Sequence, residues 1–417
     1  MVINRPEYIE RLTSKTGNGL IKVITGIRRC GKSYLLFNLF KEYLLEKGID
    51  SSHILEMTFD SYENKKYRDP EIFYPYIMGK LSDSDLYFIL LDEIQLLGDF
   101  ESVLNSLSRM PNTDIYVTGS NARFLSKDII TEFRGRGDEI HMYPLSFSEF
   151  MSVYDGDKRD GFNEYMLYGG IPLVLAQKTH DQKSSFLKAL FNEVYITDII
   201  GRNKIKNREE LEELIDIVSS AVGSLTNPSK LSQTFKSVKN KNITKITIKK
   251  YLDALSDSFL IDEAKRYDIR GKRYIGTPLK YYFSDIGLRN ARLNFRQVEE
   301  THIMENIIFN ELKLRGYDVD VGVVITNEVT EQGKKIRKQR EIDFVCNMGS
   351  KRYYIQSAFA LPDEKKREQE ERPLLLSHDG FKKIIITKEA PQPLYDEQGI
   401  LTMSIYDFLL NKESLDF

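Results

Sequence analysis

The sequence has only two cysteines, no tryptophan and no long apolar segment. Cys30 and Cys346 are too few for a disulfide framework or a cysteine-rich zinc site, and reduced thiols suit the cytosol. The longest charge-free segments, such as residues 165–177, hold 13 residues with glycine and proline among them. A membrane helix needs about 20 apolar residues, and the first ten residues are too charged for a signal peptide. We therefore expect a cytoplasmic protein without a membrane partner.

The net charge is also close to zero. The chain has 60 Lys and Arg and 62 Asp and Glu, which gives −2. A globally basic nucleic-acid-binding protein is thereby excluded. Residues 201–280 nevertheless contain 17 basic and 10 acidic residues, a local excess of +7, so basic surface is concentrated in the middle of the chain. The 417 residues, of which 41% are hydrophobic, suffice for about three domains.

Short apolar runs alternate with helical patterns from residue 20 to about residue 150. Apolar strands separated by helices predict an α/β fold with a parallel sheet covered on both faces. Residues 151–208 follow as a helical extension, 209–295 as helices and a strand-turn-strand unit, and 296–417 as a second α/β unit. The apolar runs of the first domain are Ile21–Thr25, Ile54–Phe59, Leu86–Leu91, Asp114–Thr118 and Glu139–Met142.

A phosphate-binding motif follows the first of these runs. Residues 26–33 read G-x-x-x-x-G-K-S between a strand and an apolar helix opening, the context that this motif requires. Lys32 is expected to reach the β and γ phosphate oxygens, and the Ser33 hydroxyl to ligate magnesium. The pattern predicts ATP and Mg²⁺ as ligands. The backbone expected to surround the phosphates comprises Gly26, Ile27, Arg28, Arg29, Cys30, Gly31, Lys32, Ser33 and Tyr34.

Four further residues complete the predicted active site. The run Leu86–Leu91 ends in Asp92 and Glu93, and carboxylates at the carboxyl end of a parallel strand lie near bound phosphates. Asp92 is expected to hold magnesium and Glu93 to polarise the attacking water. Asn121, after the fourth strand, is a candidate for orienting that water, and Arg136 for neutralising the γ phosphate, in preference to Arg134.

Together these segments resemble prokaryotic AAA-superfamily ATPases that carry a C-terminal domain of unknown function. The resemblance extends beyond the motifs above to residues 144–150, 168–172, 266–273 and 341–345, and so covers nearly the whole chain. It implies a P-loop AAA-type ATPase domain at residues 1–150. It does not imply what the protein acts upon.

The basic middle segment resembles a winged helix-turn-helix at residues 209–295. Thr247 is expected to cap a helix with apolar residues Ile248, Tyr251, Leu252 and Leu255 on one face, followed by a hairpin with basic residues around Arg270 and Gly271. Such domains bind DNA or proteins. The segment 236–273 is therefore a candidate for DNA contact, and a protein partner or homo-oligomer stays open.

The last domain, 296–417, resembles the restriction-endonuclease-like fold. That fold holds magnesium with an Asp and an acidic-x-Lys triplet, for which Asp343 and residues 356–358 are the matching positions. Gln356 replaces the second carboxylate and Ala358 replaces the lysine, which predicts a nuclease-like fold without nuclease chemistry. A basic loop is expected at residues 334–340. The five histidines lack zinc-ligand spacing.

The prediction is therefore a magnesium-dependent ATPase that couples its nucleotide state to DNA or protein binding by the C-terminal domains. Two alternatives stay open, a DNA-binding nucleotide switch with little turnover and an active nuclease.

Overall fold

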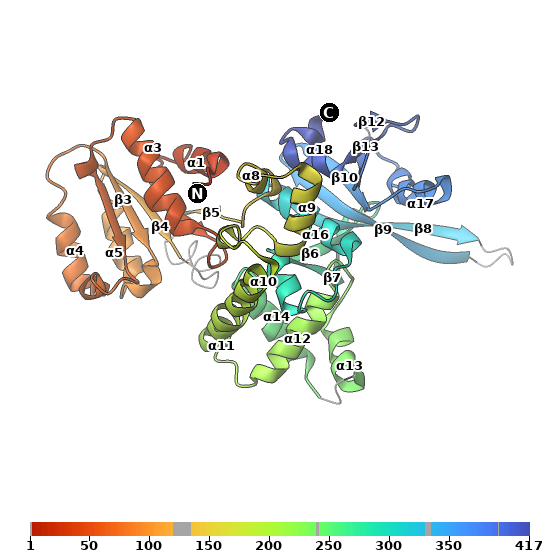
Figure 1. Ribbon diagram of the computed structural model, residues 1–417, viewed down its shortest axis with the longest axis horizontal. Helices are drawn as coiled ribbons and strands as arrows, with labels where there is room; N and C mark the ends of the chain where they lie inside the picture. Colours follow the sequence, from red (N-terminus) through yellow and green to blue (C-terminus); the bar gives the residue numbers. More distant parts are fainter. Residues whose placement is uncertain (1, 120–134, 239–241, 330–334, 391) are drawn as a thin grey trace. The chain divides into compact units, whose positions relative to one another are not determined.

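The structure, a computed structural model, describes residues 2–119, 135–238, 242–329, 335–390 and 392–417 (Figure 1). The chain forms two compact units. Unit 1 comprises Met1–Pro144 and the short segment Asp257–Phe259, and unit 2 comprises Leu145–Ser256 and Leu260–Phe417. No helix in the described ranges is long and apolar enough to span a bilayer.

Unit 1 is built on a parallel five-stranded sheet in the order β2-β3-β4-β1-β5. Each of the five apolar runs forms a strand, which confirms the predicted parallel α/β sheet. Strand β4 separates β1, which leads into the phosphate-binding motif, from β3, which ends in Asp92. The strands are β1 (Ile21–Thr25), β2 (Ile54–Thr58), β3 (Tyr87–Asp92), β4 (Thr113–Thr118) and β5 (Gly137–His141).

Helices cover both faces of this sheet. On one face, Phe73 of α4 and Leu104 of α5 pack on buried strand residues such as Val23 and Ile89. On the other face, Phe40 packs its ring 4.7 Å from that of Tyr116 on β4. The helices are α1 (Pro6–Thr13), a continuous helix made of α2 (Lys32–Tyr34), the π-helical segment Leu35–Phe40 and α3 (Lys41–Glu46), then α4 (Pro70–Met78) and α5 (Phe100–Leu107).

Unit 2 contains a mixed eight-stranded sheet in the order β12-β13-β11-β10-β9-β8-β6-β7. The expected hairpin forms as β6 and β7, but β6 also pairs in parallel with β8, with Arg266 opposite Val321. The hairpin is thus part of the sheet that contains the C-terminal strands. The strands are β6 (Ile261–Asp268), β7 (Arg273–Phe283), β8 (Asp318–Val329), β9 (Lys335–Met348), β10 (Lys351–Ala358), β11 (Lys382–Thr387), β12 (Leu394–Tyr395) and β13 (Ile400–Ser404).

The helices of unit 2 begin with the extension predicted at residues 151–208. They are α8 (Phe147–Met151), α9 (Lys158–Tyr168), α10 (His180–Ala189), which continues through the π-helical segment Leu190–Ile196 into α11 (Thr197–Asn203), α12 (Arg208–Ser220), α13 (Pro228–Val238), α14 (Lys245–Asp257), α15 (Ile286–Arg292), α16 (Glu300–Leu314), α17 (Glu364–Leu375) and α18 (Ile405–Leu410).

Two local expectations in unit 2 are corrected. Helix α14 begins before Thr247, and its first turn is capped by Thr244, whose Oγ1 accepts the Thr247 amide at 3.1 Å. The earlier threonine fits because its side chain reaches the amide three residues on. Residues 335–340 are not a loop, because they pair along β9 with residues 324–329 of β8.

The Gly169-Gly170 pair that ends α9 is explained by a buried carboxylate. Asp285 caps α15 by accepting the Leu288 amide at 2.9 Å, and its other oxygen accepts the Gly170 amide at 2.7 Å. Gly169 has a φ of 72°, and a Cβ there would lie 2.4 Å from Asp285. A side chain at residue 169 would therefore displace the carboxylate that holds this turn.

Candidate functional site

The phosphate-binding motif forms a tight loop between β1 and α2. Gly26 has a φ of 136°, and a Cβ there would lie 2.1 Å from the carbonyl oxygen of Met142. Gly31 precedes α2 with a φ of 106°. Both positions need glycine because their backbone is left-handed. Gly26 also needs it because a neighbouring backbone approaches closely. The loop therefore has the backbone that the motif predicts.

Lys32 is the first residue of α2 and is only 6% exposed. Its ammonium donates to the carbonyl oxygens of Gly26 and Ile27, each at 2.9 Å. Both acceptors are neutral, so these two bonds leave the positive charge of the lysine available to a phosphate. Ile27 and Cys30 are buried, and Arg28 is half-buried. Arg29, Ser33 and Tyr34 are exposed.

Asp92 ends β3 and lies next to Ser33. The Ser33 hydroxyl donates to Oδ1 of Asp92 at 2.9 Å, and the carboxylate is buried. Two threonines also bind it: Thr118 donates to the same oxygen, and Thr58 donates to Oδ2 at 3.4 Å. The structure thus brings together the two predicted magnesium ligands.

Glu93 follows with a φ of 53° and is half-buried. Its amide donates to Oγ1 of Thr118 at 3.2 Å, and its carboxylate accepts a hydrogen bond from the Gln95 side chain. Thr118 therefore contacts both acidic residues, through the carboxylate of one and the amide of the other. This threonine holds the Asp92 carboxylate and the backbone of Glu93.

The structure does not bring Arg136 to this site within one chain. The Arg136 carbonyl accepts the amide of Ile21, and the next residue, Gly137, pairs with Ile21 at the start of β1. The five residues of β1 span roughly 16 Å at about 3.3 Å each, so Arg136 lies at the opposite edge of the sheet from the loop. Asn121 and Arg134 lie outside the described residues.

Sequence reasoning missed Thr58, Thr118 and Gln95 as parts of the site. Thr58 and Thr118 are the last residues of β2 and β4, the two neighbours of β3. A threonine at the end of each strand was visible in the sequence, but its relevance depends on a strand order that the sequence did not give.

Comparisons with known proteins agree with this geometry. A family model described as AAA domain matches residues 18–151, and one described as domain of unknown function (DUF8612) matches residues 159–299. An uncharacterized protein of Haemophilus influenzae is 36% identical over 419 residues, which cover 98% of this chain and 99% of that protein. The chain belongs to the family of this Haemophilus protein. Its unit 1 is an AAA-type P-loop domain.

More distant similarities include an uncharacterized protein of Methanocaldococcus jannaschii, 26% identical over 384 residues that cover 88% of this chain and 80% of that protein. Among solved structures, the Aeropyrum pernix ORC1 protein in complex with DNA is 12% identical, with 70% of this chain and 93% of that chain covered and a TM-score of 0.31. Cdc6p of Pyrobaculum aerophilum is 12% identical, with 74% and 96% covered and a TM-score of 0.28.

Outside the AAA domain, unit 2 contains a buried cluster around Lys280 of β7. The ammonium lies 2.8 Å from Glu305 and from Glu341, and 3.5 Å from Asp343. Burial alone lowers the pKa of Lys280, but Tyr282 and these carboxylates raise it well above its usual value. Burial and the neighbouring Glu305 raise the pKa of Asp343 to about 7. The ammonium therefore serves as a shared counter-ion for three carboxylates.

The two residues that depart from the nuclease pattern lie on β10. The Gln356 side-chain amide donates to Glu370 at 2.9 Å, and Ala358 is 2% exposed in the core. Lys280, a lysine beside Asp343, was missed because it comes from a strand 63 positions earlier in the sequence. No local spacing signals that contact.

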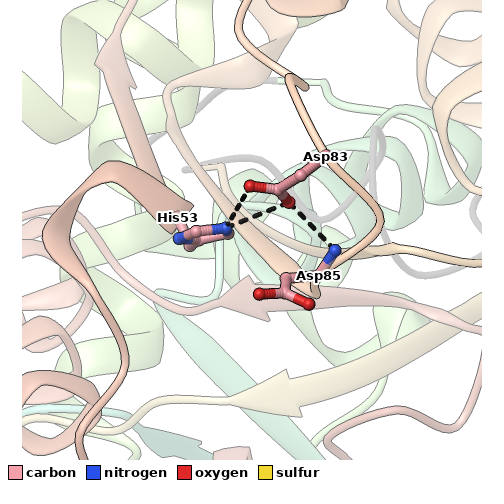
Figure 2. A group of neighbouring side chains, drawn as sticks. All are labelled: His53, Asp83 and Asp85. Carbon is pink, nitrogen blue, oxygen red and sulfur yellow. Dashed lines mark hydrogen bonds and ion pairs between the residues drawn. The ribbon is translucent and has the colours of Figure 1, made fainter.

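A second group of possible ligands lies in the AAA domain (Figure 2). Nε2 of His53 lies 3.2 Å from both oxygens of Asp83, and Asp85 donates its amide to Asp83 at 2.9 Å. Their ligand atoms fall within 4.8 Å of one another, although the sequence showed no ligand spacing. Both aspartates are exposed, and the group precedes β2 and β3. It therefore lies at the edge opposite the phosphate-binding loop.

The basic surface of unit 2 includes the helix pair α13–α14. The expected apolar face of α14 is buried, while Lys249 and Lys250 are exposed and Ile246 is 83% exposed. On β9, Arg337 and Lys338 are also exposed. These positions present cations to solvent from a helix and from a strand.

Proposed function

We propose that this protein binds ATP with magnesium at the loop of residues 26–33 and hydrolyses it to ADP and phosphate. The observation that carries the proposal is the contact between Ser33 and Asp92 directly beside the tight loop of residues 26–33. Two oxygen ligands from different elements and a buried ammonium fit a magnesium–triphosphate group. Magnesium supplies neutralisation of the phosphate oxygens when bound.

The residues of this chain then have separate tasks. The backbone amides from Gly26 to Tyr34 bind the phosphates, and Lys32 contacts the β and γ oxygens. Glu93 accepts a proton from the water whose oxygen forms a bond to the γ phosphorus, while the bond to the leaving ADP oxygen breaks. Asn121 is proposed to orient this water. Gln95 donates to Oε2 of the Glu93 carboxylate and so orients it for that task.

Phosphate release with magnesium tests these roles. We expect Lys32→Ala to weaken nucleotide binding by tenfold or more, and Glu93→Gln to bind nucleotide but lose turnover by about 10²-fold or more. Lys41→Ala removes a partly exposed lysine, paired with Glu56 at 2.8 Å, that lies on the same continuous helix, and serves as the control. Equal rates in all variants would reject the assignment.

Arg136 lies at the end of the strands opposite the phosphate-binding loop. It can therefore complete the site only from a second copy of the chain. We propose a homo-oligomer in which Arg136 of one chain reaches the γ phosphate bound by its neighbour. Arg136→Ala and Glu93→Gln should each be inactive alone, and a mixture should recover part of the wild-type rate. No recovery on mixing, with each variant still oligomeric, would reject the trans role.

The second candidate function is a nucleotide switch on DNA with little turnover. The exposure of Lys249 and Lys250 beside Ile246 at the start of α14 favours it, because the winged helix-turn-helix proposed for residues 209–295 presents such a helix to the major groove. Replacing both lysines with alanine should lower the salt slope of duplex binding by about 2. A flat salt response of the wild type would exclude phosphate contacts.

For residues 296–417 we propose a nuclease-like fold without nuclease chemistry. Gln356 and Ala358 support it, since neither supplies the metal ligand or the proton donor of that pattern. Plasmid DNA should stay intact with magnesium or manganese. Nicking that Asp343→Ala abolishes would overturn the proposal and support an active nuclease.

A further inference from the structure

Arg5, immediately before α1, is a buried arginine that contacts the phosphate-binding loop. The residue is 4% exposed. Its Nη1 donates to the carbonyl oxygen of Cys30 at 3.3 Å, and its Nη2 donates to those of Tyr143 at 3.1 Å and Pro144 at 3.2 Å. Cys30 belongs to the loop, and Pro144 is the last residue before unit 2. One guanidinium thus joins the loop to the segment by which the chain leaves the AAA domain.

Tyr8 holds this guanidinium in place. The Arg5 Cζ lies 4.5 Å from the centre of the Tyr8 ring, and the Tyr8 hydroxyl accepts the Tyr143 amide at 2.9 Å. The tyrosine is fully buried. The guanidinium is stacked on a ring and bonded to two backbone segments, so it has little freedom to reorient. A flexible lysine would not be held in this way.

A second contact joins the same two segments. Gly26 packs against the Met142 carbonyl so closely that a Cβ would lie 2.1 Å away, and the Met142 amide donates to Thr25 at 2.8 Å. The residues after β5 therefore rest directly on the loop at its start, while Arg5 connects them to its later part. A change in loop conformation has to be accommodated by residues 142–144, because close-packed backbone cannot absorb it.

We propose that Arg5 is a positioning residue of the nucleotide site, which fixes the loop at Cys30 and transmits its nucleotide state to Tyr143 and Pro144. The inference rests on the proposed binding of ATP at this loop. Arg5 acts through backbone carbonyls rather than on the phosphates. Its fork geometry is needed because two separate segments must be held at once.

Arg11, on the helix that follows Arg5, provides a matched control. Its Cζ also lies near the Tyr8 ring, at 5.4 Å, and its guanidinium pairs with Glu7 at 2.9 Å. The side chain is 28% exposed. Arg11→Ala therefore removes the same charge and a similar ring contact without removing the bonds to Cys30, Tyr143 and Pro144.

Hydrogen exchange on the full chain, with and without saturating Mg·ADP, tests the proposal. Peptides covering residues 26–36 and 140–150 report on the loop and on the exit segment. In the wild type and in Arg11→Ala, ADP should slow exchange in both peptides. In Arg5→Ala and Arg5→Lys, the loop peptide should still respond, while the response of 140–150 falls about twofold or more, since the contact of Gly26 with Met142 remains. Arg5→Lys keeps the charge and serves if the alanine variant does not fold.

The outcomes separate this inference from the proposed function. A wild-type response of the 140–150 peptide in both Arg5 variants would overturn the role of Arg5. A wild type in which the loop responds and residues 140–150 do not would overturn transmission while leaving nucleotide binding intact. A wild type in which neither peptide responds, with no heat of ADP binding, would end both proposals.

Discussion

The hydroxyl oxygen of Ser33 lies 2.9 Å from Oδ1 of Asp92, although 59 positions separate the two residues. Ser33 is the second residue of α2, after the phosphate-binding loop, and Asp92 ends β3, with β4 between β1 and β3. The contact crosses that intervening strand and defines where a metal ion would be held.

Removing either partner of this contact should weaken binding only when magnesium is present. For Asp92→Asn and Ser33→Ala we expect the affinity for Mg·ATP to fall about tenfold or more, because each loses a metal ligand. Affinity for ATP in EDTA should change little. Calorimetry under both conditions measures this. Asp83→Asn, in the loop before the same strand, is the control, and an equal loss there would contradict the assignment.

Gly26→Ala should destabilise the AAA domain more than Gly48→Ala. Gly48 needs glycine only for its backbone conformation. The added Cβ would meet the Met142 carbonyl at 2.1 Å, whereas Gly48 has a φ of 84° and open space around it. Gly48→Ala should cost about 1–2 kcal/mol from the left-handed conformation alone, and Gly26→Ala several kcal/mol with loss of nucleotide binding. Thermal unfolding and calorimetry compare them; similar losses would show that the loop relaxes.

Thr118→Val should reduce turnover more than Thr58→Val. Thr118 binds the Asp92 carboxylate and the Glu93 amide, while Thr58 reaches Asp92 at 3.4 Å. Losing Thr118 removes one hydrogen bond from the Asp92 carboxylate and one from the Glu93 amide, so we expect a drop in kcat of about 10–100-fold against a few-fold for Thr58. Phosphate release at saturating ATP measures the difference. Equal rates would mean that Thr118 does not position the carboxylates.

Asp285 should make unit 2 less stable as the pH rises. Burial raises the pKa of Asp285 to about 6, against opposing hydrogen bonds from the Gly170 and Leu288 amides. Because the folded pKa lies above the unfolded value of 3.8, the stabilising contribution of the protonated form is complete below about pH 4 and lost by about pH 6. The free energy of unfolding of the wild type should therefore fall by about 3 kcal/mol over this pH range.

Asp285→Asn stays neutral, so its unfolding free energy relative to wild type should rise by about that amount between pH 4 and pH 7. Denaturant unfolding at several pH values measures the difference. Asp253→Asn, an exposed residue on α14, should show no such trend. A constant offset between Asp285→Asn and wild type would refute the prediction.

The fold of the AAA domain was predictable because its signals are local. Continuous apolar runs such as Leu86–Leu91 specify strands wherever they occur in the chain, and residues 26–33 specify a loop between strand and helix. Strand β8, in contrast, was not predicted, although Val319, Val321 and Val323 alternate with Asp320 and Gly322, a period that is typical of a strand. It becomes a strand through pairing with β6 and β9.

Site residues were predictable where they belong to one local sequence motif. They were unpredictable where contacts between distant segments bring them to the site. Lys32 and Ser33 follow from their motif, but Arg5 reaches Tyr143 across 138 positions, and Lys280 reaches Glu305 from a different element. A buried cation carries no local sequence signal, because its neighbours are chosen by the packing of distant segments. Arg136 illustrates the converse: a suitable residue type in a suitable loop lies at the end of the sheet opposite the phosphate-binding loop of its own chain.

The pairing of β6 with β8 affects how the chain can be divided. Expressing residues 209–295 or 296–417 alone would expose the polar backbone of one strand along the cut, an edge prone to aggregation. A break after Pro144 severs no strand pairing in the described sheets. That break would part Asp257–Phe259 from the rest of unit 1, but it would leave the hairpin and the C-terminal strands together as one piece.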